Sequence, residues 1–209
     1  MTDKNTNRSA GVVYDKKNPF PSTLKRRVLL NKEGSDKETL HLELCLAGSG
    51  LEYRPGDSLA IIPTNSPQVV GQLLEAGGFD AGETVELKGG ETKPLGEVFV
   101  TDLNITGITK NVLKKYNAFA QSEKIETLLN PENKAALDDY LRRRGVIDMI
   151  ADFPVPGLAA SGFCGTLRNQ LPRLYSIASS LRAHPAEVHL TIAIVRYHSH
   201  GRDREGVCS

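Results

Sequence analysis

The spacing of hydrophobic residues changes twice along this 209-residue chain. Residues 23–30 and 39–46 alternate, and the second stretch places leucine at positions 40, 42, 44 and 46. Such alternation predicts strands with one apolar face, here joined as an antiparallel hairpin. Residues 66–150 mostly follow helical spacing, and strand-like patterns resume at residues 171–178 and 188–197. The order of strands, helices and strands predicts a β-sheet domain that is interrupted by a helical insertion.

Glycine and proline mark several boundaries within this pattern. Pro55-Gly56-Asp57 predicts a turn that leads into a buried strand at Ser58–Ile62. Ser66-Pro67 predicts the start of a helix, and Gly77-Gly78 predicts its end. Residues 152–165 contain two prolines and three glycines, so we expect a loop there.

Composition limits the class of protein. Hydrophobic residues make up 39% of the chain and charged residues 24%, which is ordinary for a soluble globular protein. The net charge of +1 favours neither nucleic acid nor anionic membranes as a partner. The sequence has no apolar run long enough to span a bilayer, and its first residues are polar, unlike a secretory signal. We therefore expect a cytoplasmic protein.

The cysteine and histidine residues do not suggest a metal site. Cys45, Cys164 and Cys208 are widely spaced and form no CxxC motif, so reduced thiols are expected. His198 and His200 are close enough in sequence to chelate a metal. They follow a predicted strand in a polar segment, however, and we interpret them as the tip of a hairpin.

The segment Arg173-Leu174-Tyr175-Ser176 places a cation, an aromatic ring and a hydroxyl close together on a predicted strand. Alternation puts Arg173 and Tyr175 on one face. A guanidinium group suits a diphosphate, and a tyrosine ring suits stacking on a planar heterocycle. Either residue alone also fits ordinary strand packing. Together they favour a site for a flavin dinucleotide.

The chain ends in Gly206-Val207-Cys208-Ser209. A glycine followed by small residues lets backbone N–H groups approach phosphate, especially where a helix is about to begin. Cys208 has no identifiable base beside it in the sequence, so we do not interpret it as a nucleophile.

These motifs carry a family resemblance. The segments RLYSIASS, VHLTIAIVRY and GVCS, with YRPGDSLAIIPTNSP upstream, resemble the FAD-binding domain of the flavoprotein (alpha) subunit of NADPH–sulfite reductase. The wider group is the cytochrome P450 reductase-like diflavin reductases. The resemblance runs from about Phe20 to Ser209.

The resemblance implies roles for single residues. By this resemblance, Arg173 binds the diphosphate, Tyr175 stacks on the isoalloxazine, and Ser176 lies near flavin N5 as the catalytic residue. Thr191 and Ala193 line the isoalloxazine, and Tyr197 stacks on the adenine. The alternative for Tyr197 is a strand-end aromatic that covers the barrel, and His189 is interpreted as structural. The implied cofactor-binding residues are Arg173, Leu174, Tyr175, Ser176, Thr191, Ala193, Tyr197, Gly206, Val207, Cys208 and Ser209.

The resemblance also implies an architecture, which is mainly β with an α insertion. Residues 1–19 would form a flexible tail. Residues 20–93 and 166–209 would form a flattened antiparallel β-barrel, of the ferredoxin reductase type. Residues 94–165 would form a helical connecting subdomain. Arg142–Arg144 fits either a docking patch for an acidic partner or a solvated helix end, and we favour the helix end.

The implied function is that of an NADPH-dependent flavoprotein reductase. NADPH would reduce FAD, and electrons would pass to a sulfite reductase haem protein or a flavodoxin-like carrier. The same fold could instead serve another acceptor such as a P450, or form a non-catalytic interaction domain without FAD. The NADPH-binding and FMN domains of the family have no counterpart in this sequence. We therefore expect a truncated piece of a longer protein, which alone would be inactive with NADPH.

Overall fold

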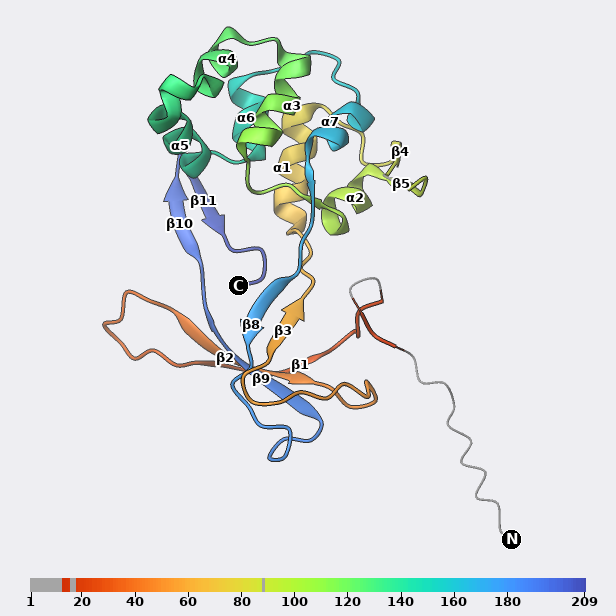
Figure 1. Ribbon diagram of the computed structural model, residues 1–209, viewed down its shortest axis with the longest axis vertical. Helices are drawn as coiled ribbons and strands as arrows, with labels where there is room; N and C mark the ends of the chain where they lie inside the picture. The colour runs from red at the N-terminus through yellow and green to blue at the C-terminus, as the bar shows by residue number, and fades with distance from the viewer. Residues whose placement is uncertain (1–12, 16–17, 88) are drawn as a thin grey trace. The chain divides into compact units, whose positions relative to one another are not determined.

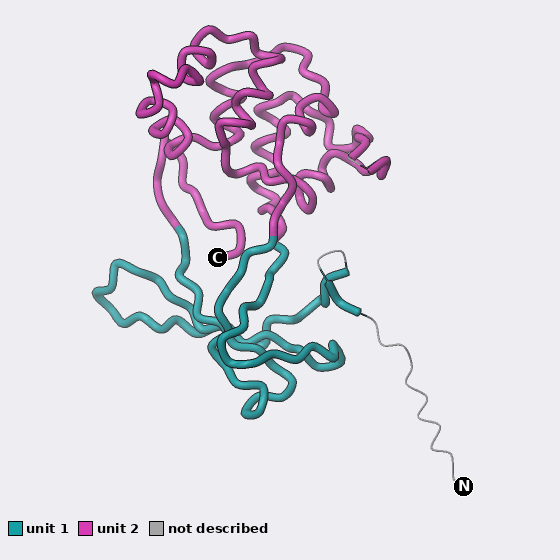
Figure 2. The backbone as a smooth tube through the Cα atoms, in the orientation of Figure 1, with its two compact units in different colours: residues 1–62, 172–195, 209 teal, residues 63–171, 196–208 magenta. Residues whose placement is uncertain are grey.

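The computed structural model describes residues 13–15, 18–87 and 89–209. The chain divides into two compact units, which Figure 2 colours separately. Unit 1 contains residues 1–62, 172–195 and 209, and unit 2 contains residues 63–171 and 196–208. Most of the predicted flexible tail, residues 1–19, lies outside the described residues.

Unit 1 consists of antiparallel strands. One sheet has the order β1–β2–β9, and β3 pairs separately with β8 (Figure 1). An isolated bridge between Ile177 and Leu190 connects the segment after β8 to β9. Within the described residues these strands do not close into a barrel. The strands are β1 Leu24–Leu29, β2 Thr39–Cys45, β3 Ser58–Ile61, β8 Arg173–Ser176 and β9 Glu187–Ala193.

The core of unit 1 comes from the alternation seen in the sequence. Leu40 pairs with Ile192 and Leu42 with Leu190, so even-numbered side chains of both strands share one face. Leu40, Leu190 and Ile192 are buried there. The predicted hairpin of β1 and β2 is confirmed. The predicted buried strand at Ser58–Ile62 is wrong in its burial, because among the described strands β3 pairs only with β8, and its residues alternate between exposed and half-buried.

Unit 2 contains all the helices of the described chain. The short strand pairs β4–β5, β6–β7 and β10–β11 accompany them. The helices are α1 Pro67–Gly77, α2 Leu95–Thr101, α3 Lys110–Ala120, α4 Glu123–Leu129, α5 Lys134–Arg143, α6 Val146–Asp152 and α7 Ala160–Thr166, with a 3-10 turn at Pro131–Asn133. The strands are β4 Thr84–Glu86, β5 Thr92–Pro94, β6 Leu103–Asn104, β7 Arg168–Asn169, β10 Arg196–Ser199 and β11 Arg202–Glu205.

Aromatic rings fill the centre of unit 2. Phe79 stacks on Phe163 with ring centroids 5.2 Å apart, and Phe99 and Tyr116 meet Phe163 edge to face. The Tyr116 hydroxyl donates a 2.7 Å hydrogen bond to the Phe153 carbonyl. Burial raises the pKa of Tyr116 to about 12, which keeps the hydroxyl a donor at neutral pH.

A buried asparagine holds the two ends of the long segment of unit 2 together. Asn65 Nδ2 donates to the carbonyls of Phe99 and Leu103, at 2.7 and 2.8 Å. Its Oδ1 accepts a 3.3 Å hydrogen bond from Gln170 Nε2. Buried amides need such partners, because an unsatisfied polar group is costly to remove from water. Residues 65 and 170, near the two ends of the segment 63–171, therefore lie side by side.

A buried carboxylate ties the hairpin β10–β11 to α6. Asp148 is 2% exposed and accepts hydrogen bonds from Arg202 and Arg204 of β11 and from the Gly145 N–H. Burial by itself would raise the pKa of Asp148. The hydrogen bonds from Arg204, the Gly145 N–H and Arg202 outweigh that effect and lower it. Asp148 is therefore ionised at neutral pH.

Two predicted elements differ from the structure, and a third is confirmed. The expected loop at 152–165 contains α7, because Phe163 and Cys164 are buried and stabilise a helix despite the nearby glycines. The predicted strand at 188–197 is two strands, since β9 ends at Ala193 and β10 begins at Arg196. The predicted helix at Ser66-Pro67 is confirmed, and Gly78 ends it with φ 64°, in the left-handed region.

The compact units divide the chain differently from the domains expected from the sequence. Residues 63–93 belong to the helical unit, and so do residues 166–171 and 196–208. The fold is mixed α and β, with a larger helical part than a mainly β domain would have. Compactness does not decide where a cofactor-binding domain ends, so the division at residues 20–93, 94–165 and 166–209 stays a prediction. No described helix combines the length and apolar character that crossing a membrane requires.

Candidate functional site

Strand β8 carries the central residues of the predicted site. Arg173 and Tyr175 are half-buried, whereas Leu174 and Ser176 are exposed, so the predicted alternation of faces is confirmed. Tyr175 packs against the buried residues of unit 1 and pairs across the strands with Leu59. The residue as a whole is only half-buried. A planar ligand could therefore cover the tyrosine from outside while the core supports it from within.

The backbone groups of β9, also in unit 1, point alternately to the two edges of the strand. The Ile194 N–H donates to Glu38 at 2.8 Å, and the Leu46 N–H donates to Ala186 at 2.8 Å. Even-numbered residues of β9 therefore bond toward β2, and odd-numbered residues present their backbone groups at the opposite edge.

That opposite edge is open near the end of the strand. At this edge the Ala178 N–H donates a hydrogen bond to the His189 carbonyl. Beyond Leu190, no described strand pairs with this edge of β9. The N–H and C=O groups of Thr191 and Ala193 point there, and both residues are exposed. A heterocycle with donors and acceptors on its rim could bind to such an edge.

Ser209 reaches this part of unit 1. Its hydroxyl accepts a 3.2 Å hydrogen bond from the Val195 N–H. Val195 is also odd-numbered and follows Ala193, so Ser209 lies where the open edge of β9 continues. The sequence motif at 206–209 gave no indication of this bond, because residues 195 and 209 are brought together only by folding.

Other predicted residues belong to unit 2. Tyr197 lies on β10, is 51% exposed and pairs with Arg204 of β11. The sequence predicted that Tyr197 ends one continuous strand with Thr191 and Ala193. That prediction is wrong, because Tyr197 lies on the separate strand β10. Gly206, Val207 and Cys208 follow β11 directly and are half-buried.

Sequence reasoning missed one supporting residue, Tyr53. Its hydroxyl lies 2.6 Å from Ser179 Oγ and donates to the Glu187 carbonyl at 2.9 Å. The Ile177 N–H donates to the Asp57 carbonyl at 3.0 Å. The YRPGD and RLYSIASS segments therefore pack on each other and fix the connection from β8 to β9. The shared occurrence of both motifs was the signal that could have indicated this contact.

Comparison with protein families gives a match over nearly the whole chain. The model of the family described as "FAD binding domain" matches residues 13–209.

Two curated relatives show similar coverage. The chain is 43% identical over 197 residues to the sulfite reductase [NADPH] flavoprotein alpha-component of Bacillus subtilis (strain 168), covering 94% of this chain and 33% of the relative. It is 37% identical over 196 residues to the protein of that name from Serratia proteamaculans (strain 568), covering 94% and 32%. The chain therefore spans about a third of the length of these relatives.

Proposed function

Since the chain belongs to the FAD-binding domain family, we propose that it is the FAD-holding part of an NADPH-dependent flavoprotein reductase that supplies a sulfite reductase haem protein. The family match supports FAD as the cofactor, as the sequence predicted. The names of the relatives support NADPH as the electron donor and sulfite reduction as the reaction that uses the electrons.

The observation that carries the proposal is the arrangement of β8 and β9 in unit 1. The half-buried Arg173 and Tyr175 share a face, and the backbone of Thr191 and Ala193 lies at an open strand edge. A guanidinium, a supported aromatic ring and unpaired backbone groups match a diphosphate joined to a flat heterocycle. These features fit FAD.

We assign roles to residues on that basis. Arg173 would bind the diphosphate, and Leu174 would lie beside it. Tyr175 would hold the isoalloxazine in place, and Ser176 would place its hydroxyl near the reacting nitrogen. When bound, FAD accepts two electrons together and releases them singly. The proposed supporting residues are Thr191 and Ala193 at the ring, Tyr197 at the adenine, and Gly206, Val207, Cys208 and Ser209 at the diphosphate.

We also propose that the strands of unit 1 belong to the flattened antiparallel barrel of the ferredoxin reductase type. The bridge between Ile177 and Leu190 supports this, because it joins the β3–β8 pair to the sheet β1–β2–β9. The antiparallel pairing throughout unit 1 agrees with that architecture.

Substitution of Arg173 tests the diphosphate contact. Arg173→Ala should weaken FAD binding by roughly tenfold to a hundredfold, because a charge-assisted hydrogen bond contributes about 1.5–3 kcal/mol. Flavin fluorescence during titration of the FAD-free chain measures the affinity. Arg27→Ala, at an exposed arginine of β1, is the matched control and should bind FAD normally.

Riboflavin separates the phosphate contact from ring binding. It has the same ring and no diphosphate, so its affinity should change little in Arg173→Ala. Equal losses for FAD and riboflavin would refute the assignment of Arg173 to the diphosphate. Equal FAD affinity of Arg173→Ala and Arg27→Ala would refute it as well.

An experiment that identifies the electron acceptor requires the full-length protein. With NADPH, that protein should drive reduction of sulfite to sulfide by the separate haem protein. Sulfide formation measures this directly. Rapid reduction of a flavodoxin-like carrier, without any sulfide when the haem protein is present, would favour the alternative acceptor.

A further inference from the structure

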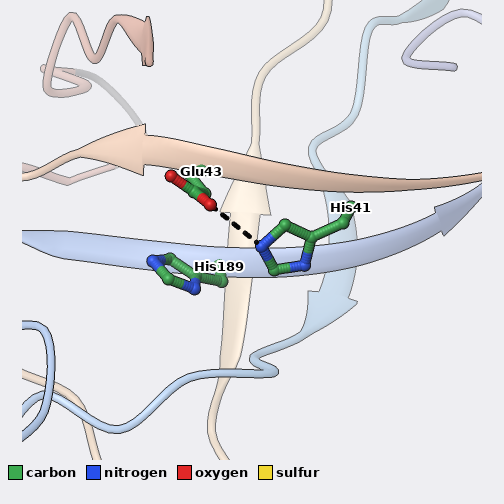
Figure 3. Close-up of side chains that lie close together, drawn as sticks. All are labelled: His41, Glu43 and His189. Carbon is green, nitrogen blue, oxygen red and sulfur yellow. Dashed lines mark ion pairs between the residues drawn. The ribbon is translucent and has the colours of Figure 1, made fainter. Parts of the chain in front are cut away.

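The outer face of the sheet β1–β2–β9 carries histidine and glutamate side chains. His41 and Glu43 of β2 lie close to His189 of β9 (Figure 3), and Glu43 is opposite His189 in the register of the two strands. Glu187 precedes His189 by two residues, so alternation puts all four on the face opposite the leucines. His184 lies in the turn before β9, with its ring centroid 4.2 Å from that of His189. We call His41, Glu43, His184, Glu187 and His189 the histidine cluster.

Three members of the cluster have ligand atoms close enough to share a cation. The candidate ligand atoms of His41, Glu43 and His189 all lie within 4.8 Å of one another. His41 Nε2 is 3.4 Å from Glu43 Oε1. Metal bonds of about 2.0–2.2 Å in a tetrahedron put neighbouring ligands about 3.3–3.6 Å apart. One pair already has this spacing, and the other separations, which are at most 4.8 Å, would need to shorten by up to about 1 Å.

The cluster is partly withdrawn from water. The His189 side chain is 10% exposed, Glu43 is 17% and His41 is 26% exposed. The His41 and His189 rings meet edge to face, with centroids 5.1 Å apart. A neutral imidazole has one nitrogen with a lone pair, which is the form that binds metal. Two such rings beside a carboxylate form a compact set of donors.

Charged neighbours decide which carboxylate is available. Lys25 forms an ion pair with Glu187, and Arg26 Nη1 lies 3.3 Å from Glu43 Oε1. Glu187 is held by Lys25 at Oε1 and by His189 at Oε2. The Arg26 side chain is 65% exposed, so it can turn to water with little loss. Glu43 is therefore the carboxylate that a cation can recruit more easily.

Glu187 has a different use in this arrangement. Its Oε2 lies 3.1 Å from His189 Nε2, within hydrogen-bond distance. A carboxylate at one ring nitrogen orients a metal-binding histidine and raises the basicity of the ring. His184 Nδ1 is 3.9 Å from the same oxygen, and its side chain is 44% exposed. His184, Glu187 and His189 form a second possible triad, with a more exposed histidine and a carboxylate held by Lys25.

We propose that His41, Glu43 and His189 bind one divalent first-row transition metal ion of the zinc type, with Glu187 as the positioning residue for His189. Two imidazoles and one carboxylate suit Zn²⁺, Co²⁺ or Ni²⁺, whereas Mg²⁺ and Ca²⁺ prefer oxygen ligands. Water completes the fourth position. The ion joins β2 to β9 across the sheet. The sequence predicted no metal site, since His189 lies more than 140 positions after His41 and Glu43 and only the pairing of β2 with β9 brings it beside them.

Titration of the metal-free chain with Co²⁺ and Zn²⁺ tests the proposal. One equivalent of Co²⁺ should give the visible absorption bands of a four-coordinate site, and Zn²⁺ should displace it. His41→Asn, Glu43→Gln and His189→Asn should each weaken Zn²⁺ binding by at least about tenfold. His198→Asn removes an exposed histidine of β10 that contacts Asp203, and as the matched control it should bind normally.

Nuclear magnetic resonance of the histidine rings gives a second readout and checks folding. Zn²⁺ should shift the ring nitrogens of His41 and His189 and leave those of His198 unchanged, with the remaining spectrum intact. Absence of saturable one-to-one binding by the wild-type chain would overturn the proposal. So would loss of binding in His184→Asn with binding retained in His41→Asn, because that result assigns the ion to the second triad.

Discussion

Asp148→Asn tests whether a buried ion pair anchors the hairpin β10–β11. The carboxylate is 2% exposed, and the Arg204 and Arg202 side chains are 16% and 30% exposed. Arg202 Nε donates to Asp148 Oδ1 at 3.1 Å, and the Gly145 N–H donates to Oδ2 at 2.6 Å. The amide has one acceptor oxygen in place of two. At least one of these donors therefore loses its partner.

The expected loss of stability is about 3 kcal/mol. Breaking a buried ion pair by removing one partner costs about 3–5 kcal/mol, because the remaining charge is left without compensation. The lower end applies here, since Arg202 is partly exposed and can reach water. With a urea dependence of roughly 2 kcal/mol per molar, the midpoint should fall by about 1.5 M.

Urea unfolding followed by far-ultraviolet circular dichroism measures this change. The signal at 222 nm reports on helices, which in the described chain lie in unit 2 with Asp148. Asp139→Asn is the matched control, because Asp139 also pairs with two arginines, Arg142 and Arg143, but its side chain is 44% exposed. It should shift the urea midpoint little, because exposed ion pairs contribute little to stability. Equal costs for the two substitutions would refute the argument from burial.

Acidity gives an independent check on the same pair. The folded-state pKa of Asp148 is lowered, so its stabilising contribution is present above the ordinary aspartate pKa. That contribution is lost as pH falls through the folded-state value. The difference in midpoint between the wild type and Asp148→Asn should therefore shrink in acid, and a constant difference down to pH 2 would contradict the assigned cause.

Two further predictions concern space and charge. Gly145→Ala should destabilise unit 2 by about 1–3 kcal/mol, because a Cβ there would lie 2.5 Å from the Thr106 carbonyl oxygen and 2.8 Å from Arg204 Nη1. Gly71→Ala, in α1 with nothing within 4 Å, should instead stabilise by about 0.5–1 kcal/mol, and opposite signs in urea midpoints check the pair. The Glu187 carboxyl should titrate near pH 2 in a carbon-detected magnetic resonance experiment, so its stabilising effect is present above pH 4.5 and lost toward pH 2. A midpoint near 4.5 would show that the Lys25 contact does not persist in solution.

Local patterns predicted much of this fold. The leucines of β2 indicated both the strand and its buried face, because a period of two in one segment needs no knowledge of the rest of the chain. Gly78 likewise ended α1 through its own conformational freedom. The helix α7 was missed, because the burial of Phe163 depends on Phe79, Phe99 and Tyr116, which are distant in sequence.

The candidate site divides in the same way. Arg173, Tyr175 and Ser176 could be recognised because their chemistry is carried by one short strand. The open edge of Thr191 and Ala193 could not be derived from composition, since it depends on which neighbour β9 has on each side. The histidine cluster was missed for a related reason. Its members lie in two sequence segments, and the register of β2 against β9 decides that Glu43 faces His189.

The hydrogen bond between Asn65 and Gln170 has a consequence for the order of folding. Pairing of β3 with β8 closes the loop formed by residues 62–172, which for a flexible chain costs about 4 kcal/mol of entropy. Once the helices assemble, Asn65 and Gln170 are already joined, and only a few residues separate each of them from its strand. The remaining closure entropy is then roughly 2 kcal/mol smaller. The helical insertion thus favours a sequence of events in which unit 2 forms first and brings β3 and β8 within reach of each other.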